Sequence, residues 1–435
     1  MASKRRTQRL SILQNGEPTG ILERAPTGAV SFTYAESWLE APERHPLSMS
    51  LLLQEGTYRG AEVFSFFDNL LPDNMDIRNR VAQQVQAEST RTFDLLRAIG
   101  HDCVGSLQFL EEGSPAPKDN IKAKPLSAKK IEKVLKDLQF FPLGMQTEEP
   151  DFRISLAGVQ EKTALLWWKD AWHLPLASTP TTHVLKPPMG IIHHGIDLTT
   201  SVENEWLCLK LCELFGLQVA QSEISRFGQQ RCLVVERFDR QWRGTKRLLR
   251  LPQEDICQAF GLPSTKKYES DGGPGIPAIM GFLNSSDQRD RDRETFMRAQ
   301  LAFYLLGATD GHGKNFSLRL TQNGFELTPL YDVMSVFPAL GKKQVPWQKA
   351  KLAMAVGKSR HYRLKDITRR HFEETSKNSG FSEKALSKLV EELGDVAHSD
   401  LLGKIRLPSK FPEPIAAAIL KGIRSQAERL TASKG

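Results

Sequence analysis

One ten-residue stretch, residues 307–316, gathers side chains that could transfer a phosphoryl group. It runs Gly-Ala-Thr-Asp-Gly-His-Gly-Lys-Asn-Phe and places Asp310 five residues before Asn315, with Lys314 between them. An aspartate can accept or orient the proton of an attacking hydroxyl, an asparagine can coordinate Mg²⁺, and a lysine can neutralise charge on the transferred group. The same Asp-x4-Asn spacing occurs in kinase catalytic loops. A polar turn without catalytic function is the alternative, because such a spacing also arises by chance.

The residues after this stretch favour the catalytic interpretation. A short apolar run, an Asn323-Gly324 turn and a second run lead to Tyr331 and Asp332, which predicts a hairpin followed by a second aspartate. Kinases return a metal-binding carboxylate to the catalytic loop by this route. Because Mg²⁺ prefers one or two carboxylates together with phosphate oxygens, Asn315 and Asp332 are sufficient protein ligands, with Asp332 as the main one.

Lys186 ends a β-branched segment and suits contact with the α- and β-phosphates of a nucleotide. Downstream, Ser201 opens a predicted helix with Glu203 and Glu205 near its start. Glu205, nineteen residues after Lys186, could hold the lysine in an ion pair, as in kinases. Glu203 could also do so, and an acid placed there only to complement the helix dipole is a third possibility.

Two further segments have the form of nucleotide-contacting elements. Residues 154–166 predict a strand, a loop and a strand, and backbone N–H groups around the loop's single glycine, Gly158, could line phosphates. Residues 233–240 form an apolar strand that turns polar, as expected of a hinge whose backbone meets adenine. By themselves a one-glycine loop and a plain strand end are weak signals.

The elements that must position these residues are visible in the hydrophobic pattern. An apolar helix over residues 296–306 precedes the Asp310 loop, and a strand over 316–320 follows it. Near the beginning of the chain, the pattern predicts a hairpin around Asn15-Gly16, a buried helix over 63–71 stopped by Pro72, and a helix over 92–99.

A polar, lysine-rich connector spans residues 111–130, and Ser127 near its end is a predicted cap of an amphipathic helix. A strand-rich part followed by a helix-rich part is the order that a two-lobed kinase would show, although other α+β enzymes share it.

Bulk composition places the chain among ordinary globular proteins. Its 435 residues imply two or three lobes, and 40% of them are hydrophobic and 25% charged. No apolar stretch approaches the roughly 20 residues needed to span a bilayer. The five scattered cysteines, among them the buried-helix candidates Cys208 and Cys212, indicate core thiols in a reducing compartment. We therefore expect a cytoplasmic protein.

Positive charge is concentrated in one segment. Residues 342–370 contain ten Lys or Arg against one acid, Asp366, so this segment alone carries +9, whereas the whole chain carries +8. Such a segment attracts polyanions such as nucleic acid. A solvated basic surface loop is the alternative.

With these motifs in order, the chain resembles the HipA family of serine/threonine-protein kinase toxins from bacterial toxin–antitoxin pairs. The resemblance covers nearly the whole sequence. It is carried by residues 67–73, 151–166, 235–240, 251–263, 267–275, 310–315 and 331–332.

The resemblance implies an α+β class with a two-lobed protein-kinase-like (phosphoinositide-kinase-like) fold and an additional N-terminal α/β lobe. The expected divisions are the N-terminal lobe at 1–110, a linker and connecting helix at 111–150, a strand-rich nucleotide-binding part at 151–240 and a helix-rich catalytic part at 241–435.

The resemblance also implies roles for single residues. Asp310 would be the catalytic base, Asn315 and Asp332 the Mg²⁺ ligands, and Ser155 the site of inactivating autophosphorylation. ATP would be contacted by Ala157, Gly158, Val159, Gln160, Glu161, Lys162, Lys186, Glu236, Arg237, Phe238, His312, Gly313, Lys314, Asn315, Tyr331 and Asp332.

The implied partners are the DNA-binding antitoxin HipB, operator DNA within the toxin–antitoxin complex, and a protein substrate, glutamyl-tRNA synthetase, whose modification would arrest growth and promote persistence. In that complex the protein would be nucleoid-associated. Arg369, Arg370 and Lys377 are the candidates for direct DNA contact.

Two other functions stay open at this stage. The first is a DNA-associated co-repressor with a vestigial kinase site, which the intact set of Lys186, Asp310, Asn315 and Asp332 argues against. The second is a small-molecule or lipid kinase, because Asp-Gly-His-x-x-Asn also occurs in the phosphoinositide-kinase loop. The absence of a membrane-binding segment argues against a lipid substrate.

Overall fold

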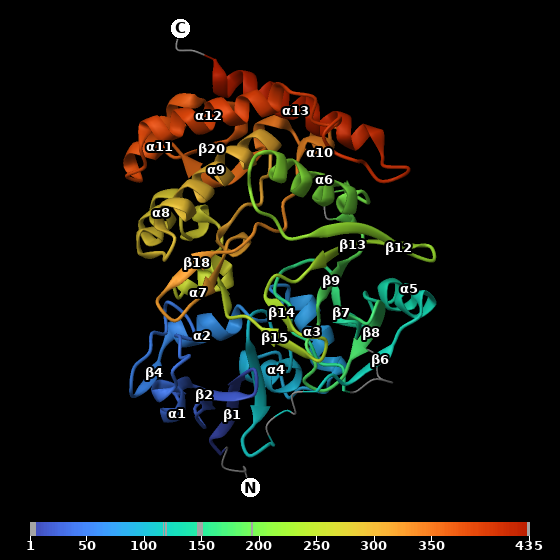
Figure 1. Ribbon diagram of the computed structural model, residues 1–435, viewed down its shortest axis with the longest axis vertical. Helices are drawn as coiled ribbons and strands as arrows, with labels where there is room; N and C mark the ends of the chain where they lie inside the picture. Colours follow the sequence, from blue (N-terminus) through green and yellow to red (C-terminus); the bar gives the residue numbers. More distant parts are fainter. Residues whose placement is uncertain (1–5, 116, 118–119, 146–150, 193–194, 433–435) are drawn as a thin grey trace. The chain divides into compact units, whose positions relative to one another are not determined.

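The computed structural model describes residues 6–115, 117, 120–145, 151–192 and 195–432. The chain forms two compact units (Figure 1). The first unit takes its described residues from Met1–Pro187, Arg226–Ser264 and Leu318–Gly324, and the second from Pro188–Ser225, Thr265–Ser317 and Phe325–Gly435.

The first unit begins with a five-stranded antiparallel sheet in the order β4-β3-β2-β1-β5. The predicted hairpin is confirmed, because Asn15 (φ 50°) and Gly16 (φ 91°) make the turn between β1 and β2 with the positive φ angles that a tight hairpin requires. The strands are β1 (Gln8–Gln14), β2 (Glu17–Arg24), β3 (Val30–Tyr34), β4 (Thr57–Arg59) and β5 (Leu107–Glu111).

Four helices accompany this sheet: α1 (Glu36–Glu40), α2 (Ala61–Asp68), α3 (Met75–Gln84) and α4 (Thr92–Ile99). Phe66, Phe67, Phe93 and Phe109 are almost fully buried between the helices and the sheet. Helix α4 has the predicted bounds. Helix α2 ends three residues before the predicted end, because a proline ring clashes with the carbonyl four residues back and disfavours helical backbone just before it.

A second sheet follows in the order β12-β13-β9-β7-β8-β6. Its strands are β6 (Ala123–Pro125), β7 (Thr163–Trp168), β8 (Ala171–Pro175), β9 (His183–Lys186), the edge strand β12 (Ser222–Phe227), whose last two residues lie in this unit, and β13 (Gln230–Glu236). Ser127 caps helix α5 (Ala128–Lys136), as predicted, by accepting a hydrogen bond from Lys130 N at 3.3 Å. The unit is completed by β14 (Arg240–Arg243), β15 (Arg247–Arg250), β16 (Gln253–Asp255) and α7 (Ile256–Ala259).

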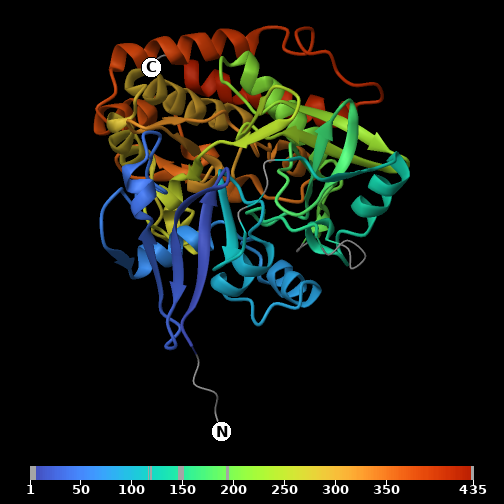
Figure 2. The ribbon, with the colours of Figure 1, turned by 60° about the horizontal axis from the view of Figure 1, so that its bottom comes forward.

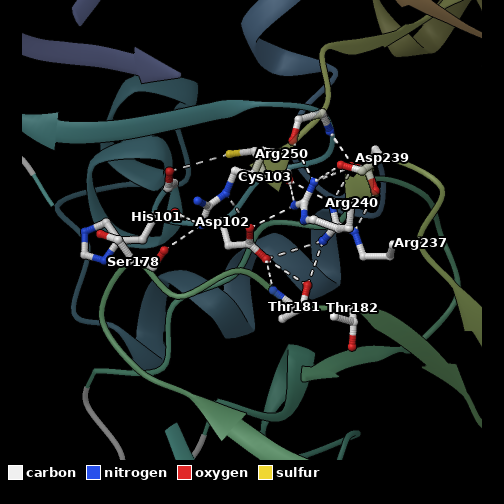
Figure 3. A network of polar contacts seen from close by, with 12 residues as sticks. His101, Asp102, Cys103, Ser178, Thr181, Thr182, Arg237, Asp239, Arg240 and Arg250 are labelled. Atoms are coloured by element: carbon white, nitrogen blue, oxygen red, sulfur yellow. Dashed lines mark hydrogen bonds and ion pairs between the residues drawn. The ribbon is translucent and has the colours of Figure 1, made fainter. Parts of the chain in front are cut away.

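A buried network of ion pairs joins distant segments of the first unit (Figure 3). The carboxylate of Asp102, just after α4, receives hydrogen bonds from Arg240 at 2.8 Å and Arg250 at 3.0 Å and lies 3.4 Å from Arg237. Asp239 in turn binds Arg237 at 2.7 Å and Arg240 at 2.9 Å. Burial alone would raise the pKa of Asp102, but the three guanidinium groups outweigh it and hold the pKa well below its usual range.

The second unit is mainly helical. Helix α9 is at its centre, with Phe296, Leu301 and Tyr304 fully buried, and it contacts α12 and α13, which lie beside each other (Figure 1, Figure 2). The helices are α6 (Ser201–Leu214), α8 (Ile276–Phe282), α9 (Arg289–Leu306), α10 (Phe337–Gly341), α11 (Arg369–Asn378), α12 (Glu383–His398) and α13 (Glu413–Thr431).

Short strands complete the described part of the second unit: the hairpins β10 (Gly190–Ile192) with β11 (Ile196–Leu198) and β19 (Lys351–Val356) with β20 (His361–Arg363), and β18 (Phe325–Leu327). Strand β17 (Ser317–Leu320), whose last three residues belong to the first unit, precedes the predicted Asn323-Gly324 turn, and β18 follows it. Within that turn, Thr321 N donates to Gly324 O at 3.0 Å.

All five cysteines are buried free thiols, and Cys208 and Cys212 lie in the core on α6, as predicted. Burial raises the pKa of both of these thiols. Among the described residues, no helix has the length and apolarity that crossing a membrane would require.

The Asp102 network makes a stability prediction. Asp102→Ala leaves three buried arginines with only Asp239 as a counter-charge, and losing one partner of a buried ion pair costs about 3–5 kcal/mol. We expect the urea unfolding midpoint to fall sharply. Lys388→Ala is the control, because Lys388 is 74% exposed in its pair with Glu392 and should change the midpoint little. An Asp102→Ala midpoint equal to that of the wild type would contradict this account.

Candidate active site

Helix α9 delivers the Asp310 loop from the core of the second unit. Gly307 ends the helix in the left-handed conformation at φ 60°, which glycine adopts without strain. Ala308 N then donates to Phe303 O at 2.8 Å. A side chain at Gly311 would place its Cβ 2.4 Å from Cδ2 of Phe303, so the loop can pack against the helix only with glycine there.

Backbone groups of this loop bond within the loop. His312 N donates to Asp310 O at 2.8 Å and lies 3.3 Å from Oδ1 of Asn315, while Asn315 N donates to His312 O at 2.9 Å. Gly313–Asn315 form one turn of 3-10 helix. His312, Lys314 and Asn315 are therefore buried although all three are polar.

The segment after β18 returns to this loop. The hydroxyl of Tyr331 donates to Lys314 O at 2.8 Å and lies 2.5 Å from Oγ of Ser317. Asn315 Nδ2 donates to the carbonyl oxygen of Asp332 at 3.4 Å. Asp332 has φ 60°, a left-handed conformation that aspartate tolerates better than most residues. Within the second unit, the structure thus brings the segments that carry Asp310, Asn315 and Asp332 together.

The electrostatic environment of Asp310 suits a base. Surrounding protein atoms displace water and raise its pKa, although 51% of the side chain remains exposed. A hydrogen bond from Tyr268 opposes this rise, the negative charge of Asp332 adds to it, and Lys267 opposes it. A carboxylate whose pKa is raised is a stronger base when ionised.

The donor set at the Asp310 loop fits a magnesium ion. Asn315 offers an amide oxygen and Asp332 a carboxylate, and hard oxygen donors of this kind hold Mg²⁺ together with phosphate oxygens and water. These two side chains come from adjacent segments, as the 3.4 Å contact between Asn315 Nδ2 and Asp332 O shows.

The predicted phosphate loop lies in the first unit. Lys162 Nζ donates to Ala157 O at 2.5 Å across the loop, and Gly158 adopts φ 105°, where a Cβ would lie 2.7 Å from that Nζ. Gly158 O accepts from Asp73 N at 3.1 Å. Gln160 Nε2 donates to Pro187 O at 3.1 Å, which anchors the loop beside the end of β9.

The predicted strand before this loop is wrong. Residues 154–156 belong to no strand, because their polar groups bond to neighbouring segments instead of a sheet. Ser155 N donates to Asp102 O at 2.9 Å, and Ser155 Oγ donates to Leu70 O at 2.7 Å. Ser155 is fully buried as a result. The strand after the loop, β7, does form.

Lys186 and the predicted hinge also lie in the first unit. Lys186 is the buried last residue of β9 and pairs with Leu233 of β13. Arg237 follows the end of β13, and its guanidinium belongs to the Asp102 network while its N–H donates to Thr182 O at 2.9 Å. The guanidinium group and the backbone N–H of Arg237 therefore both have hydrogen-bond partners within the first unit.

Glu203 and Glu205 are both buried on α6 in the second unit. Lys186 lies in the first unit, so the choice between the two glutamates as its partner stays open.

Sequence reasoning missed three residues around these loops. Arg80 forms an ion pair with Glu161, and Asp73 N holds Gly158 O, so both support the phosphate loop. Tyr268 donates a hydrogen bond to Oδ1 of Asp310. Its only signal in the sequence is its place inside the 267–275 string, which supports the family resemblance without indicating a role.

The basic segment is partly neutralised. Arg369 and Arg370 on α11 pair with glutamates one turn later, Glu373 at 3.1 Å and Glu374 at 3.5 Å. Arg370 is nevertheless 68% exposed, and Lys377 is exposed in the last turn of the helix.

Comparison with known proteins identifies the family. The family model of the HipA N-terminal domain matches residues 10–110, and that of the HipA-like C-terminal domain matches residues 154–401. A protein of Sinorhizobium fredii named putative kinase Y4mE is 32% identical over 80% of this chain and 81% of its own length. The serine/threonine-protein kinase toxin HipA of Shewanella oneidensis is 32% identical over 72% of this chain and 71% of its own.

A solved structure confirms the predicted fold class. A chain from the complex of Shewanella oneidensis HipA, HipB and operator DNA superimposes with a TM-score of 0.80 at 24% identity, covering 97% of each chain. Together with the two family models and the 32% identity over most of the sequence, this shows that the chain belongs to the HipA family of kinases.

Proposed function

We propose that this chain is the toxin of a toxin–antitoxin pair and that it uses Mg-ATP to phosphorylate a serine or threonine hydroxyl of a protein. The observation that carries this proposal is the meeting of the segments of Asp310, Asn315 and Asp332 in the second unit. In this proposal residues 151–240 are the nucleotide-binding part and residues 241–435 the catalytic part, with 1–110 as an additional N-terminal lobe and 111–150 as its connection.

In this proposal Asp310 accepts the proton of the acceptor hydroxyl. The hydroxyl oxygen forms a bond to the γ-phosphorus of ATP as the bond from that phosphorus to the ADP oxygen breaks. Asn315 and Asp332 would hold Mg²⁺, which would supply positive charge to neutralise the phosphates. The family resemblance assigns further nucleotide contacts to Lys186, His312, Lys314, the loop at 157–162 and the segment 236–238.

Conservative substitutions test the catalytic assignment. Asp310→Asn removes the base, whose contribution is about 10²–10⁴-fold in rate, and Asp332→Asn removes a metal ligand while keeping a residue type that tolerates positive φ. We expect both to lose nearly all transfer of label from γ-labelled ATP to protein while keeping the wild-type circular dichroism. Asp290→Asn, at a fully exposed aspartate, is the matched control. Wild-type rates in either site variant would refute the assignment.

We further propose that Ser155 is an autophosphorylation site that inactivates the enzyme. Its side chain is fully buried and its hydroxyl donates to Leu70 O at 2.7 Å, so this conformation leaves no room for a phosphate group on Ser155. A phosphoryl group adds a charge of about −2. Phosphorylation of Ser155 therefore requires the backbone around residue 155 to move out of its buried position, and the added phosphate prevents its return. The adjoining loop at 157–162 is displaced with it.

Intact-mass measurement tests this second proposal. After incubation with Mg-ATP, the wild type should gain the mass of one phosphoryl group, whereas Ser155→Ala and Asp310→Asn should gain none. Ser127→Ala, at a helix cap of the same unit, serves as the control and should gain the same mass as the wild type. A phosphorylated Ser155→Ala protein would place the modification elsewhere.

The proposed partners are the antitoxin HipB and operator DNA, and the proposed substrate is glutamyl-tRNA synthetase. The proposed location is the cytoplasm, with association to the nucleoid when the protein is in the complex. Support for the partners comes from the Shewanella oneidensis protein, which was solved with HipB and its operator, and from the exposed cations Arg370 and Lys377 on α11. Arg369 is a weaker candidate, because it pairs with Glu373 and is only 28% exposed.

Salt dependence tests the DNA contact. If Arg370 and Lys377 each neutralise one phosphate, replacing both by alanine should reduce the slope of log affinity against log salt by about 1.8, at about 0.9 per contact. The measurement is fluorescence anisotropy of labelled operator with the complete toxin–antitoxin complex. A matched pair of exposed lysines, Lys388 and Lys421, provides the control double variant. An unchanged slope in the α11 variant would show that α11 does not touch DNA.

A further inference from the structure

The segment at 267–275 is held firmly against the Asp310 loop. The carbonyl oxygen of Tyr268 accepts hydrogen bonds from Asp271 N at 3.0 Å and Gly273 N at 2.9 Å, which closes a compact turn. The carbonyl of Lys267 accepts from Gly313 N at 3.1 Å, so the turn is bonded to the loop through its backbone.

A second anchor fixes the other side of this turn. The carboxylate of Glu269 accepts a hydrogen bond from Ala355 N at 2.5 Å and pairs with Arg360 at 3.2 Å. Gly275 lies so close to this carboxylate that a Cβ would be 2.5 Å from Oε1. Tyr268 is therefore flanked by residues whose positions are fixed by the rest of the second unit.

From this position the side chain of Tyr268 contacts the Asp310 loop twice. Its hydroxyl donates to Oδ1 of Asp310, and its ring packs edge-on against the ring of His312 with centroids 4.9 Å apart. The charged and titratable groups that face the Asp310 carboxylate are thus Tyr268, Lys267, His312 and Asp332.

The carboxylate of an aspartate turns about a torsion with a broad energy minimum, so a fixed donor on one oxygen determines where the other oxygen points. We propose that Tyr268 is a positioning residue for phosphoryl transfer: by holding Oδ1, it directs Oδ2 of Asp310 to the acceptor hydroxyl. This inference rests on the proposed function, because it gives Tyr268 a role only through Asp310.

The hydrogen bond also explains how the base stays available. Burial and the charge of Asp332 favour the protonated, inactive form of Asp310, whereas a donor such as the Tyr268 hydroxyl favours the ionised form. The positional effect is the larger one for rate, because displacing a reacting group by about 1 Å can cost about 10²-fold.

Tyr268→Phe tests the inference, because it removes the donor and keeps the ring against His312. Rates are measured as phosphate released to water from γ-labelled Mg-ATP, so the result does not depend on the identity of the protein substrate. We expect kcat to fall about 10–100-fold while KM for ATP and the calorimetric affinity for Mg-ADP stay at wild-type values. Tyr268 is partly exposed, so this change leaves the core intact.

Tyr304→Phe is the matched control. It deletes the same atom from a buried tyrosine of α9 whose hydroxyl donates to Ile367 O at 3.0 Å, and it should lower the unfolding midpoint without changing kcat.

The inference is overturned if Tyr268→Phe has a wild-type or higher kcat, if only its nucleotide affinity changes, or if Tyr304→Phe loses as much activity. In each of these cases an inactive Asp310→Asn would still uphold the proposed function. An Asp310→Asn variant with the wild-type rate would overturn both.

Discussion

The cost of burying polar groups decides how the Asp310 loop is built. His312, Lys314 and Asn315 are buried beside an apolar helix, and an unpaired buried polar group costs roughly 1–3 kcal/mol. The loop avoids part of this cost by bonding to itself and to the returning Tyr331–Asp332 segment. The hydrogen bonds that make burial possible are also those that fix the separation of the proposed base and metal ligands. Stability and catalytic geometry are therefore supplied by the same contacts.

In the first unit, ion pairs offset the cost of burying polar groups. Asp102 receives three guanidinium groups from segments that are more than a hundred residues away in the sequence. Its backbone oxygen also holds Ser155 N. The network thus joins the N-terminal lobe, the segment after β13 and the start of the proposed phosphate loop. This explains physically why a lobe without proposed catalytic residues is part of the same compact unit as strands β7, β9 and β13.

Much of this arrangement could be predicted from sequence, because local signals determine it. The Asn15-Gly16 turn, helix α4, the Ser127 cap and the loop after α9 all depend on residues within a few positions of each other. Long-range contacts could not be predicted. Tyr268 lies 42 residues before Asp310, the predicted strand at 154–156 is replaced by bonds to Leu70 and Asp102, and Arg237 is engaged by a distant carboxylate. Family resemblance identified the strings that contain Tyr268, residues 154–156 and Arg237, but not the contacts that these residues make.

The contact between Gly311 and Phe303 has a consequence for how the sequence of this site can diverge. Any side chain at 311 would occupy space that the ring at 303 already fills, and the positive φ of Gly307 closes a second position of the same turn to most residues. A larger residue at position 311 can be accepted only after the residue at position 303 has been replaced by a smaller one. Positions 303 and 311 should therefore vary together, and a homologue with alanine or serine at 311 should have a smaller side chain at 303.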